Sequence, residues 1–254
     1  STARPWAIIG VSIKPMPPTP PQPPGRFNAF EPTTVAGALT GVIRTKIAGN
    51  PVSLDVIAAN STRTAIDSAF TGTVKVEVLD ASNNTGGMDA NGCRSTWTVI
   101  SPLTTNLSFA AGDFGRKTVS FTEANSYRDV RVRVSYPTTS PTLIGCSNDN
   151  FAIRPSNLVN FAVSDSGTWE TAGTTRALND VIFTAPPTGK IHKAGRPMSV
   201  RASAVNATGT TVTTNYTGAP TSWLSACAGA ACTSSFGTLT LASTFAVGQL
   251  SNDA

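Results

Sequence analysis

Charged side chains are scarce in this chain of 254 residues, where 19 basic and 14 acidic residues make up 13% of the sequence. That is about half the share found in typical soluble domains, and it excludes coiled coils and helical bundles, which are rich in Ala, Glu, Lys, Leu and Arg. His192 is the single histidine, so catalysis by two histidines and metal sites with several are excluded. No apolar run approaches the ~20 residues that span a bilayer, and we expect no membrane span.

The residues that are abundant favour strands. Thr is the commonest residue, beside 21 Gly and 18 Pro, and the 40% of hydrophobic residues suffices for a core. Apolar residues occupy every second position in short runs, as a strand with one buried face requires. These runs lie at 52–56, 74–78, 119–121, 130–136, 198–204, 212–216 and 238–241, with a shorter one at 245–247. Many short strands of this kind predict an all-β fold of immunoglobulin-like sandwiches.

The net charge of +5 does not indicate a nucleic-acid partner, because the basic residues are scattered. Their one cluster is Arg128, Arg131 and Arg133 in YRDVRVRVSY. Arg131 and Arg133 alternate with valines, so they share one face of a strand. We interpret that face as the solvated side of an edge or surface strand; a contact with an anionic glycan or phosphate is the alternative.

The cysteines are four in number and form no C-x-x-C zinc motif: Cys93, Cys146, Cys227 and Cys232. An even count in a Thr- and Gly-rich chain indicates disulfides and an oxidising compartment. The short loop between Cys227 and Cys232 favours their pairing and leaves Cys93 with Cys146, while free buried thiols are the alternative.

Residues 1–26 are predicted to form an N-terminal strand followed by a Pro-rich linker, here called the arm. No intact signal peptide is present, so we expect a processed N-terminus or a piece of a longer precursor. Residues 15–24, PMPPTPPQPP, predict a stiff polyproline II spacer. The β-prone segment before the spacer cannot form a core alone and must pair with its own domain or a neighbour. Its apolar members are Trp6, Ile8, Ile9, Val11 and Ile13.

An internal repeat divides the rest of the chain. Residues 48–54, AGNPVSL, match residues 194–200, AGRPMSV, at an offset of 146, and Asn60 and Asn206 match at the same offset. So do the FTG at 70–72 and the YTG at 216–218. We infer a strand–turn–strand motif present twice, and hence two related β-sandwich domains.

The expected domains are an arm at 1–26, a first sandwich at 27–150 and a second at 151–254. The second copy is shorter after its YTG turn and ends at SNDA. We therefore expect its closing strand to come from a continuation of the polypeptide or from another chain.

Several stretches resemble one family, and CSNDNFAIRP followed by AGRPMSV and the YTG turn is the most specific of them. Together with FNAFEPTTVAGALTGVIRTKIAGNPVSLDVIA and GRKTVSFTEANSYRDVRVRVSYP, they are similar to the large secreted proteins of Gram-negative bacteria labelled MshQ, after biogenesis of the MSHA type IV pilus. The resemblance covers roughly residues 27–250. It implies a cell-surface or pilus-associated β-domain protein in which the chain continues into further β domains, and it implies no enzyme.

The segment 80–92, DASNNTGGMDANG, carries the oxygen donors that Ca²⁺ prefers. The candidate ligands are Asp80, Asn83, Asn84, Asp89 and Asn91. Thr85 stands where an EF-hand needs Gly and no Glu closes the loop, so the alternative is a hairpin loop held by Cys93. No cofactor other than such a calcium ion is expected.

No catalytic motif is apparent. His192 aligns with Lys46 in the repeat, which indicates a solvent-facing position. Carboxylate pairs of glycosidases need no sequence motif, but nothing indicates one, and Glu77 is expected on an outward strand face beside Lys75. Trp97 is expected to pack in the core near a disulfide, whereas Trp169 and Trp223 are equally compatible with the core or with sugar stacking.

The sequence therefore favours a non-enzymatic, extracellular structural or adhesive protein on the surface of a Gram-negative bacterium. It would assemble with copies of itself or with other pilus or surface subunits, with Trp6–Ile13 added as a strand to a neighbour. The alternative is a carbohydrate- or calcium-binding adhesin module of a pilus-tip protein, with a surface glycan as its partner.

Overall fold

A computed structural model describes residues 23–165, 176–177, 198–217, 224–228, 234–239 and 245–253. The described residues form strands and one short 3-10 helix, η1 (Ala111–Asp113), which confirms the all-β fold class. The chain divides into two compact units between Arg154 and Pro155. In the described part, no helix has the length and hydropathy that crossing a membrane requires.

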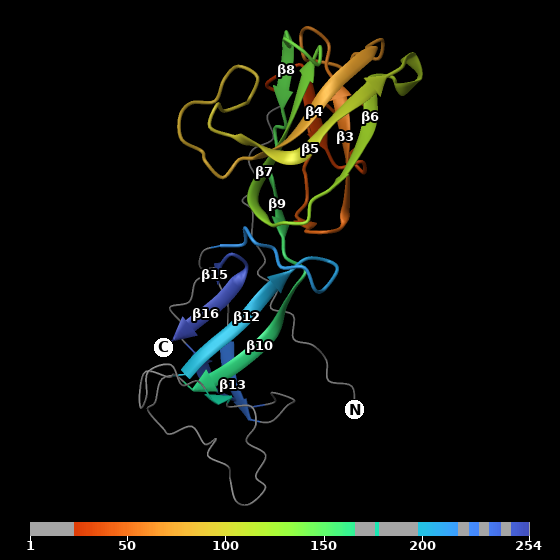
Figure 1. The fold of residues 1–254 in the computed structure, drawn as a ribbon. Helices are drawn as coiled ribbons and strands as arrows, with labels where there is room; N and C mark the ends of the chain where they lie inside the picture. Colours follow the sequence, from red (N-terminus) through yellow and green to blue (C-terminus); the bar gives the residue numbers. More distant parts are fainter. Residues whose placement is uncertain are drawn as a thin grey trace, which may run out of the picture. The chain divides into compact units, whose positions relative to one another are not determined.

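The first unit contains two sheets (Figure 1). The three-stranded antiparallel sheet has the order β1 (Phe27–Phe30), β3 (Pro51–Ala58) and β6 (Arg116–Thr122). The larger sheet has the order β2 (Lys46–Ile47), β9 (Phe151–Arg154), β7 (Tyr127–Tyr136), β4 (Gly72–Asp80) and β5 (Thr98–Phe109). Its sixth strand, β8 (Leu143–Cys146), pairs with β7, and β2 runs parallel to β9.

The two sheets share one hydrophobic core, so the first unit is a β-sandwich. Leu54 and Val56 of β3 belong to the same buried cluster as Val76 of β4 and Val132 of β7. Each of these valines and leucines stabilises the fold by about 1.5–3 kcal/mol when fully buried. The ring of Phe70 meets three other aromatic rings edge-on at centroid distances of 5.4–5.5 Å: Phe27, Phe109 and Tyr136.

The second unit has a five-stranded sheet and a separate strand pair. The sheet order is β11 (Arg176–Ala177), β10 (Asn157–Asp165), β12 (Met198–Val205), β16 (Gln249–Asp253) and β15 (Phe245–Ala246). The pair is β13 (Leu224–Ala228) with β14 (Ser234–Leu239).

Three strand predictions in this unit need correction. The run 212–216 is no strand: Val212 makes an isolated bridge to Val205 and the chain then turns. The polar end of the chain was not predicted as a strand, yet β16 occupies it and pairs with β12. The apolar run at 245–247 is shorter than expected, because Val247 lies in the turn between β15 and β16.

The sequence repeat is also a backbone repeat. The amide of Asp67 donates to the carbonyl of Ala58 at 2.8 Å, and 146 residues later Thr213 donates to Ala204 at 2.9 Å. In the adjoining turns, Asn60 bonds Ala65 as Asn206 bonds Thr211, both at 2.9 Å.

The repeat extends to both neighbouring strands. Ile57 faces Arg116 across β3 and β6, and the matching Ser203 faces Gln249 across β12 and β16. On the other side, β1 pairs with β3 as β10 pairs with β12. The shared element is therefore a three-stranded antiparallel sheet, in which the pairing of β10 with β12 has an irregularity between Val159 and Ala162 that the pairing of β1 with β3 lacks.

Candidate functional site

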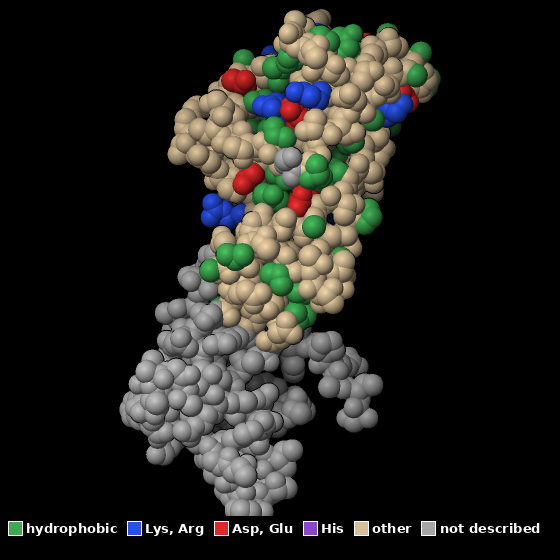
Figure 2. All heavy atoms as spheres, viewed as in Figure 1, with side chains coloured by type: hydrophobic (Ala, Val, Ile, Leu, Met, Phe, Trp, Pro, Cys, Tyr) green, Lys and Arg blue, Asp and Glu red, His purple; other side chains and the backbone are tan. Residues whose placement is uncertain are grey.

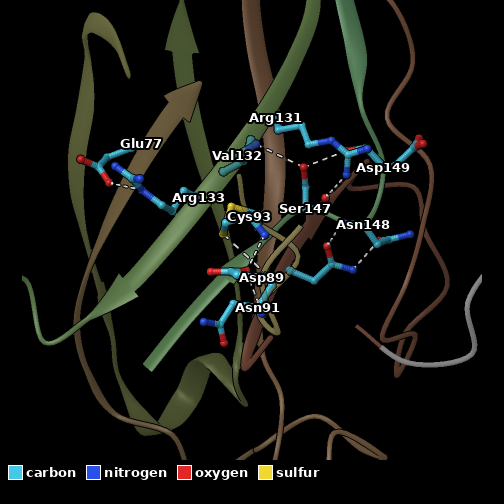
Figure 3. Close-up of a disulfide and its surroundings, with 12 residues drawn as sticks. Glu77, Asp89, Asn91, Cys93, Arg131, Val132, Arg133, Ser147, Asn148 and Asp149 are labelled. Atoms are coloured by element: carbon cyan, nitrogen blue, oxygen red, sulfur yellow. Dashed lines mark hydrogen bonds and ion pairs between the residues drawn. A yellow bond between two sulfur atoms is a disulfide. The ribbon is translucent and has the colours of Figure 1, made fainter. Parts of the chain in front are cut away.

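A disulfide fastens the loop after β4 to the end of β8 (Figure 3). Cys93 and Cys146 are joined with Cα atoms 5.3 Å apart, across 53 residues of sequence. This is the pairing that remains when Cys227 and Cys232 pair with each other. The loop from residue 81 to residue 97, here called the clamped loop, is thereby held against the sheet.

The clamped loop builds a second, smaller hydrophobic cluster in the first unit. Its members are Leu79, Ala81, Cys93, Trp97 and Cys146. Because neighbouring residues of a strand point to opposite faces, Leu79 lies on the side of β4 away from the core residue Val78. The outer face of the six-stranded sheet is therefore partly covered rather than solvated.

Trp97 is the centre of this cluster and is only 4% exposed. Its indole N–H donates to the Asn84 side-chain oxygen at 3.1 Å, and the Arg131 guanidinium lies 5.2 Å from the ring centroid. The prediction that Trp97 packs near a disulfide is confirmed. A buried indole offers no open face on which a sugar ring could stack.

Arg131 connects the clamped loop to the turn after β8. Its guanidinium donates to the Ser147 carbonyl at 2.6 Å. Burial lowers the pKa of Arg131, while the charges of Asp129 and Asp149 act in the opposite direction. The group stays charged at neutral pH, since arginine does not deprotonate in proteins.

The prediction of a solvated edge or surface strand for Arg131 and Arg133 is wrong. Strand β7 lies inside the sheet, between β9 and β4, and the clamped loop covers part of its outer face. Arg133 donates to the Glu77 carboxylate at 2.8 Å. Both guanidinium groups therefore bind within the chain.

Glu77 lies on the outer face beside Lys75, as predicted, but its residue is only 6% exposed. Lys75 stands 3.1 Å from one carboxylate oxygen and Arg133 stands 2.8 Å from the other. Burial by itself would raise the pKa of Glu77, but hydrogen bonds from Arg133 and Lys75 and their positive charges outweigh it and lower the pKa. Glu77 is an ion-paired structural carboxylate.

The turn between β8 and β9 is a buried polar junction. The Ser147 hydroxyl accepts from the Val132 amide and donates to the Asp149 carbonyl at 2.7 Å. The Asp149 carboxylate accepts from the amide of Ile43 at 2.7 Å. The turn thus ties β7 to the segment that follows β1.

Asn28 completes this junction from β1 and is fully buried. Its side chain donates to the Leu39 carbonyl at 2.8 Å and accepts from the amides of Ala29 and Asn148. Buried polar side chains require such partners, because an unpaired one costs about 1–3 kcal/mol. The CSNDN sequence therefore has a structural role in closing the sandwich.

Four of the five candidate calcium ligands accept hydrogen bonds from residues close to them in the sequence. Asp80 accepts from the Ser82 amide, Asn83 from Thr85, and Asn84 from Trp97. One oxygen of Asp89 accepts from the amides of Asn91 and Cys93, both at 2.8 Å. In the described ranges, no group of three or more His, Cys, Asp or Glu side chains is placed to hold a metal ion.

Several predicted residues lie outside the described part of the chain. They are the assembly strand residues Trp6, Ile8, Ile9, Val11 and Ile13, and Cys232, Trp169, Trp223 and His192. Cys227 belongs to β13. The predicted domain boundary after residue 150 precedes β9, which pairs with β7 in the first unit.

Sequence reasoning missed the junction of Asn28, Arg131 and Ser147. Two signals pointed to it: arginines alternating with valines in an apolar strand, and CSNDN directly after a cysteine. Both residue patterns occur more often on exposed surfaces, and here contacts distant in sequence make them internal: Trp97 of the clamped loop for Arg131, and β1 with the segment after it for the CSNDN turn.

Two comparisons with known proteins found no match. No protein-family profile matches the sequence, and none of the curated proteins compared with it matches either.

Proposed function

We propose that this chain is a structural or adhesive β-sandwich protein of the bacterial cell surface, a subunit of a surface filament or of a pilus-associated assembly. The proposed role is not enzymatic. The MshQ-like resemblance of the sequence supports a Gram-negative source and a pilus-associated setting.

One observation carries the proposal: the three-stranded sheet β1-β3-β6 recurs as β10-β12-β16, with the same turn and with matching pairing of the central strand to β6 and to β16. Repeating one structural unit along a chain extends a protein without a new fold, and each added unit presents fresh surface to partners. Such construction suits a protein whose task is to span distance or to hold other proteins.

The disulfide supports a location outside the cytoplasm. Cytosolic thiols are kept reduced, whereas disulfides persist in the periplasm and on cell surfaces. The Cys93–Cys146 bond spans 53 residues and holds the clamped loop, so the first unit depends on oxidation for its outer layer.

The surface chemistry is also consistent with assembly. Figure 2 shows the Lys, Arg, Asp and Glu side chains on the visible face of the first unit as scattered spots on a surface of backbone and other side chains. Edge strands without charge are the ones that add a further strand most readily. The alternative of a glycan- or calcium-binding module gains no support from the first unit, where Trp97 is buried and the loop oxygens bind loop amides.

The test is immunogold electron microscopy of bacteria that carry the native protein, with an antibody against the first unit. We expect label on the outside of intact cells, along filaments or at pili. Deletion of the gene is the control and should remove the label. Label that appears only after the cells are permeabilised, and then only in the cytoplasm, would contradict the proposal.

A further inference from the structure

Strand β5 is an open edge of the six-stranded sheet. It follows β4 in the sheet order, and among the described residues no other strand pairs with it (Figure 1). Every second residue of such a strand directs its N–H and C=O groups away from the sheet, where they can bond a further strand. At 12 residues, β5 is long for an edge strand.

The usual protection of an edge is weak in β5. Its sequence, TVISPLTTNLSF, contains no charged residue, and Pro102 lies near the start, beside the irregularity in pairing with β4. The other described edges of the first unit differ: β6 begins with Arg116 and Lys117, β1 and β8 have four residues each, and β2 has two. After Pro102, β5 is therefore the long unprotected edge of this unit.

The middle of β5 reads almost the same in both directions. Residues 103–107 are Leu-Thr-Thr-Asn-Leu, with Thr105 at the centre. Leu103 and Leu107 both pack against the hydrophobic core and are partly buried, so they lie on the inner face. Thr104 and Asn106 are exposed and lie opposite Glu77 and Lys75 of β4 on the outer face.

This pattern fits a second copy of the same strand. In a two-fold contact, residue i meets residue j and residue j meets residue i, so a self-pairing strand needs a sequence that is symmetric about its centre. Antiparallel pairing centred on Thr105 brings Leu103 against Leu107 on the inner face, which continues the apolar layer from one copy to the next. On the outer face, Thr104 meets Asn106, two side chains that can hydrogen-bond.

We propose that β5 pairs antiparallel with β5 of a second copy of this chain, in register about Thr105, to form a continuous sheet across a two-fold dimer. The inference rests on the proposed function, since it names the surface by which this assembly subunit joins another. A two-fold contact closes at two copies, so a longer assembly would use a second surface as well.

Charges introduced at the two outer-face positions, Thr104 and Asn106, test the pairing in the full chain. Thr104→Lys with Asn106→Lys places like charges opposite each other twice, and so does Thr104→Glu with Asn106→Glu. Sedimentation equilibrium should show each variant alone dimerising at least about tenfold more weakly than the wild type. An equimolar mixture of the two variants should dimerise again, because each lysine then meets a glutamate.

The mixture is the matched control, since both variants carry exposed changes at the same positions and any folding defect would persist in it. Circular dichroism of each variant checks that it folds. The proposal is overturned if the wild type stays monomeric throughout the concentration range, or if the mixture dimerises no better than its components.

Cross-linking tests the register. Thr105→Cys should form a disulfide between copies under mild oxidation, because residue 105 lies opposite itself. Thr104→Cys should not cross-link with itself but should cross-link with Asn106→Cys when the two are mixed, and peptide mapping identifies the joined residues. Equal cross-linking of Thr104→Cys and Thr105→Cys with themselves would contradict this register.

The β5 dimer and the proposed function can fail independently of each other. A monomeric protein can still be labelled on the cell surface, and a β5-mediated dimer can form in solution whatever the cellular location of the protein.

Discussion

The two units share a three-stranded backbone arrangement but hold it with different cross-strand side chains. In the first unit, Arg116 of β6 binds Asp55 of β3 at 2.7 Å. It also donates to carbonyl oxygens of the loop after β1 and lies 5.2 Å from the Phe30 ring centroid. In the second unit, Gln249 stands at the position of Arg116, and it accepts from the Ser203 hydroxyl at 2.7 Å.

What the units share is the chemistry of their turns. Asn60 and Asn206 each accept, through the side-chain oxygen, from groups two to four residues further on. Gly115 and Gly248 both have φ of +72°, and their carbonyls accept from the amides of Ala58 and Ala204 at 2.8 and 2.7 Å. The comparison teaches that the turns fix the register, while the cross-strand side chains are free to change.

The largest expected effect is a loss of stability in the first unit alone when its disulfide is removed. Replacing Cys93 and Cys146 together by Ala removes a cross-link across 53 residues, and chain entropy then lowers the free energy of unfolding of the first unit by about 4 kcal/mol. Hydrogen exchange followed by mass spectrometry should show faster exchange in β4 and β7. Exchange in β12 is the internal control and should not change; equal acceleration in both units would contradict a local effect of the disulfide.

The shared glycines give the next largest effect. A Cβ at Gly115 would lie 2.2 Å from the Asp67 carbonyl oxygen, and a Cβ at Gly248 would lie 2.5 Å from that of Thr213. Gly115→Ala should cost about 2–3 kcal/mol of stability in chemical denaturation and Gly248→Ala somewhat less, because both positions also have positive φ.

Gly112→Ala is the matched control, since a Cβ there meets nothing within 4 Å. If Gly115→Ala unfolds at the same denaturant concentration as Gly112→Ala, the shared turn does not fix the register.

Replacing the turn asparagines, Asn60 and Asn206, should lower stability by a smaller amount, and the loss should differ between the two copies of the turn. Asn206 is 3% exposed, whereas Asn60 is only half-buried. Asn206→Ala should therefore cost about 1 kcal/mol and Asn60→Ala less, as measured by urea denaturation with local exchange. Asn→Asp at either position keeps the acceptor oxygen and should restore most of the loss; no recovery would mean that the oxygen is not the stabilising atom.

The smallest expected effect is acid sensitivity confined to the first unit. The pKa of Glu77 is lower folded than unfolded, so its stabilisation is present above the unfolded pKa and is lost as pH falls through the folded one. Glu77→Gln should lower stability at neutral pH by about 1 kcal/mol or less and flatten its decline below about pH 5. An unchanged pH profile of the first unit would contradict the ion-pair role.

Much of the fold could be predicted from the sequence, because alternation and repetition are local signals. The valine alternation located β4 and β7, and the offset of 146 located the shared turn. Strand β5 was missed because its apolar residues change face at the irregularity near Pro102.

The candidate site could not be predicted to the same degree. The partly buried position of Arg131 depends on the clamped loop, whose Trp97 ring lies against its guanidinium and which a disulfide ties to a distant part of the sequence. No local sequence pattern indicates that a distant loop buries a side chain. The calcium prediction rested on the number of oxygen donors alone, and the sequence does not show that nearby amides already bind oxygens of Asp80 and Asp89.

The disulfide also sets how the first unit would respond to tension along the chain. Residues between Cys93 and Cys146 cannot lengthen under load, so full extension is shortened by about 180 Å, from 53 residues at about 3.4 Å each. Strands β5, β6 and β7 all lie within that locked segment. A pulling force would therefore draw out β1, β3 and β4, which precede Cys93, while β5, β6 and β7 stayed within the closed segment, giving the unit a built-in limit to stretching.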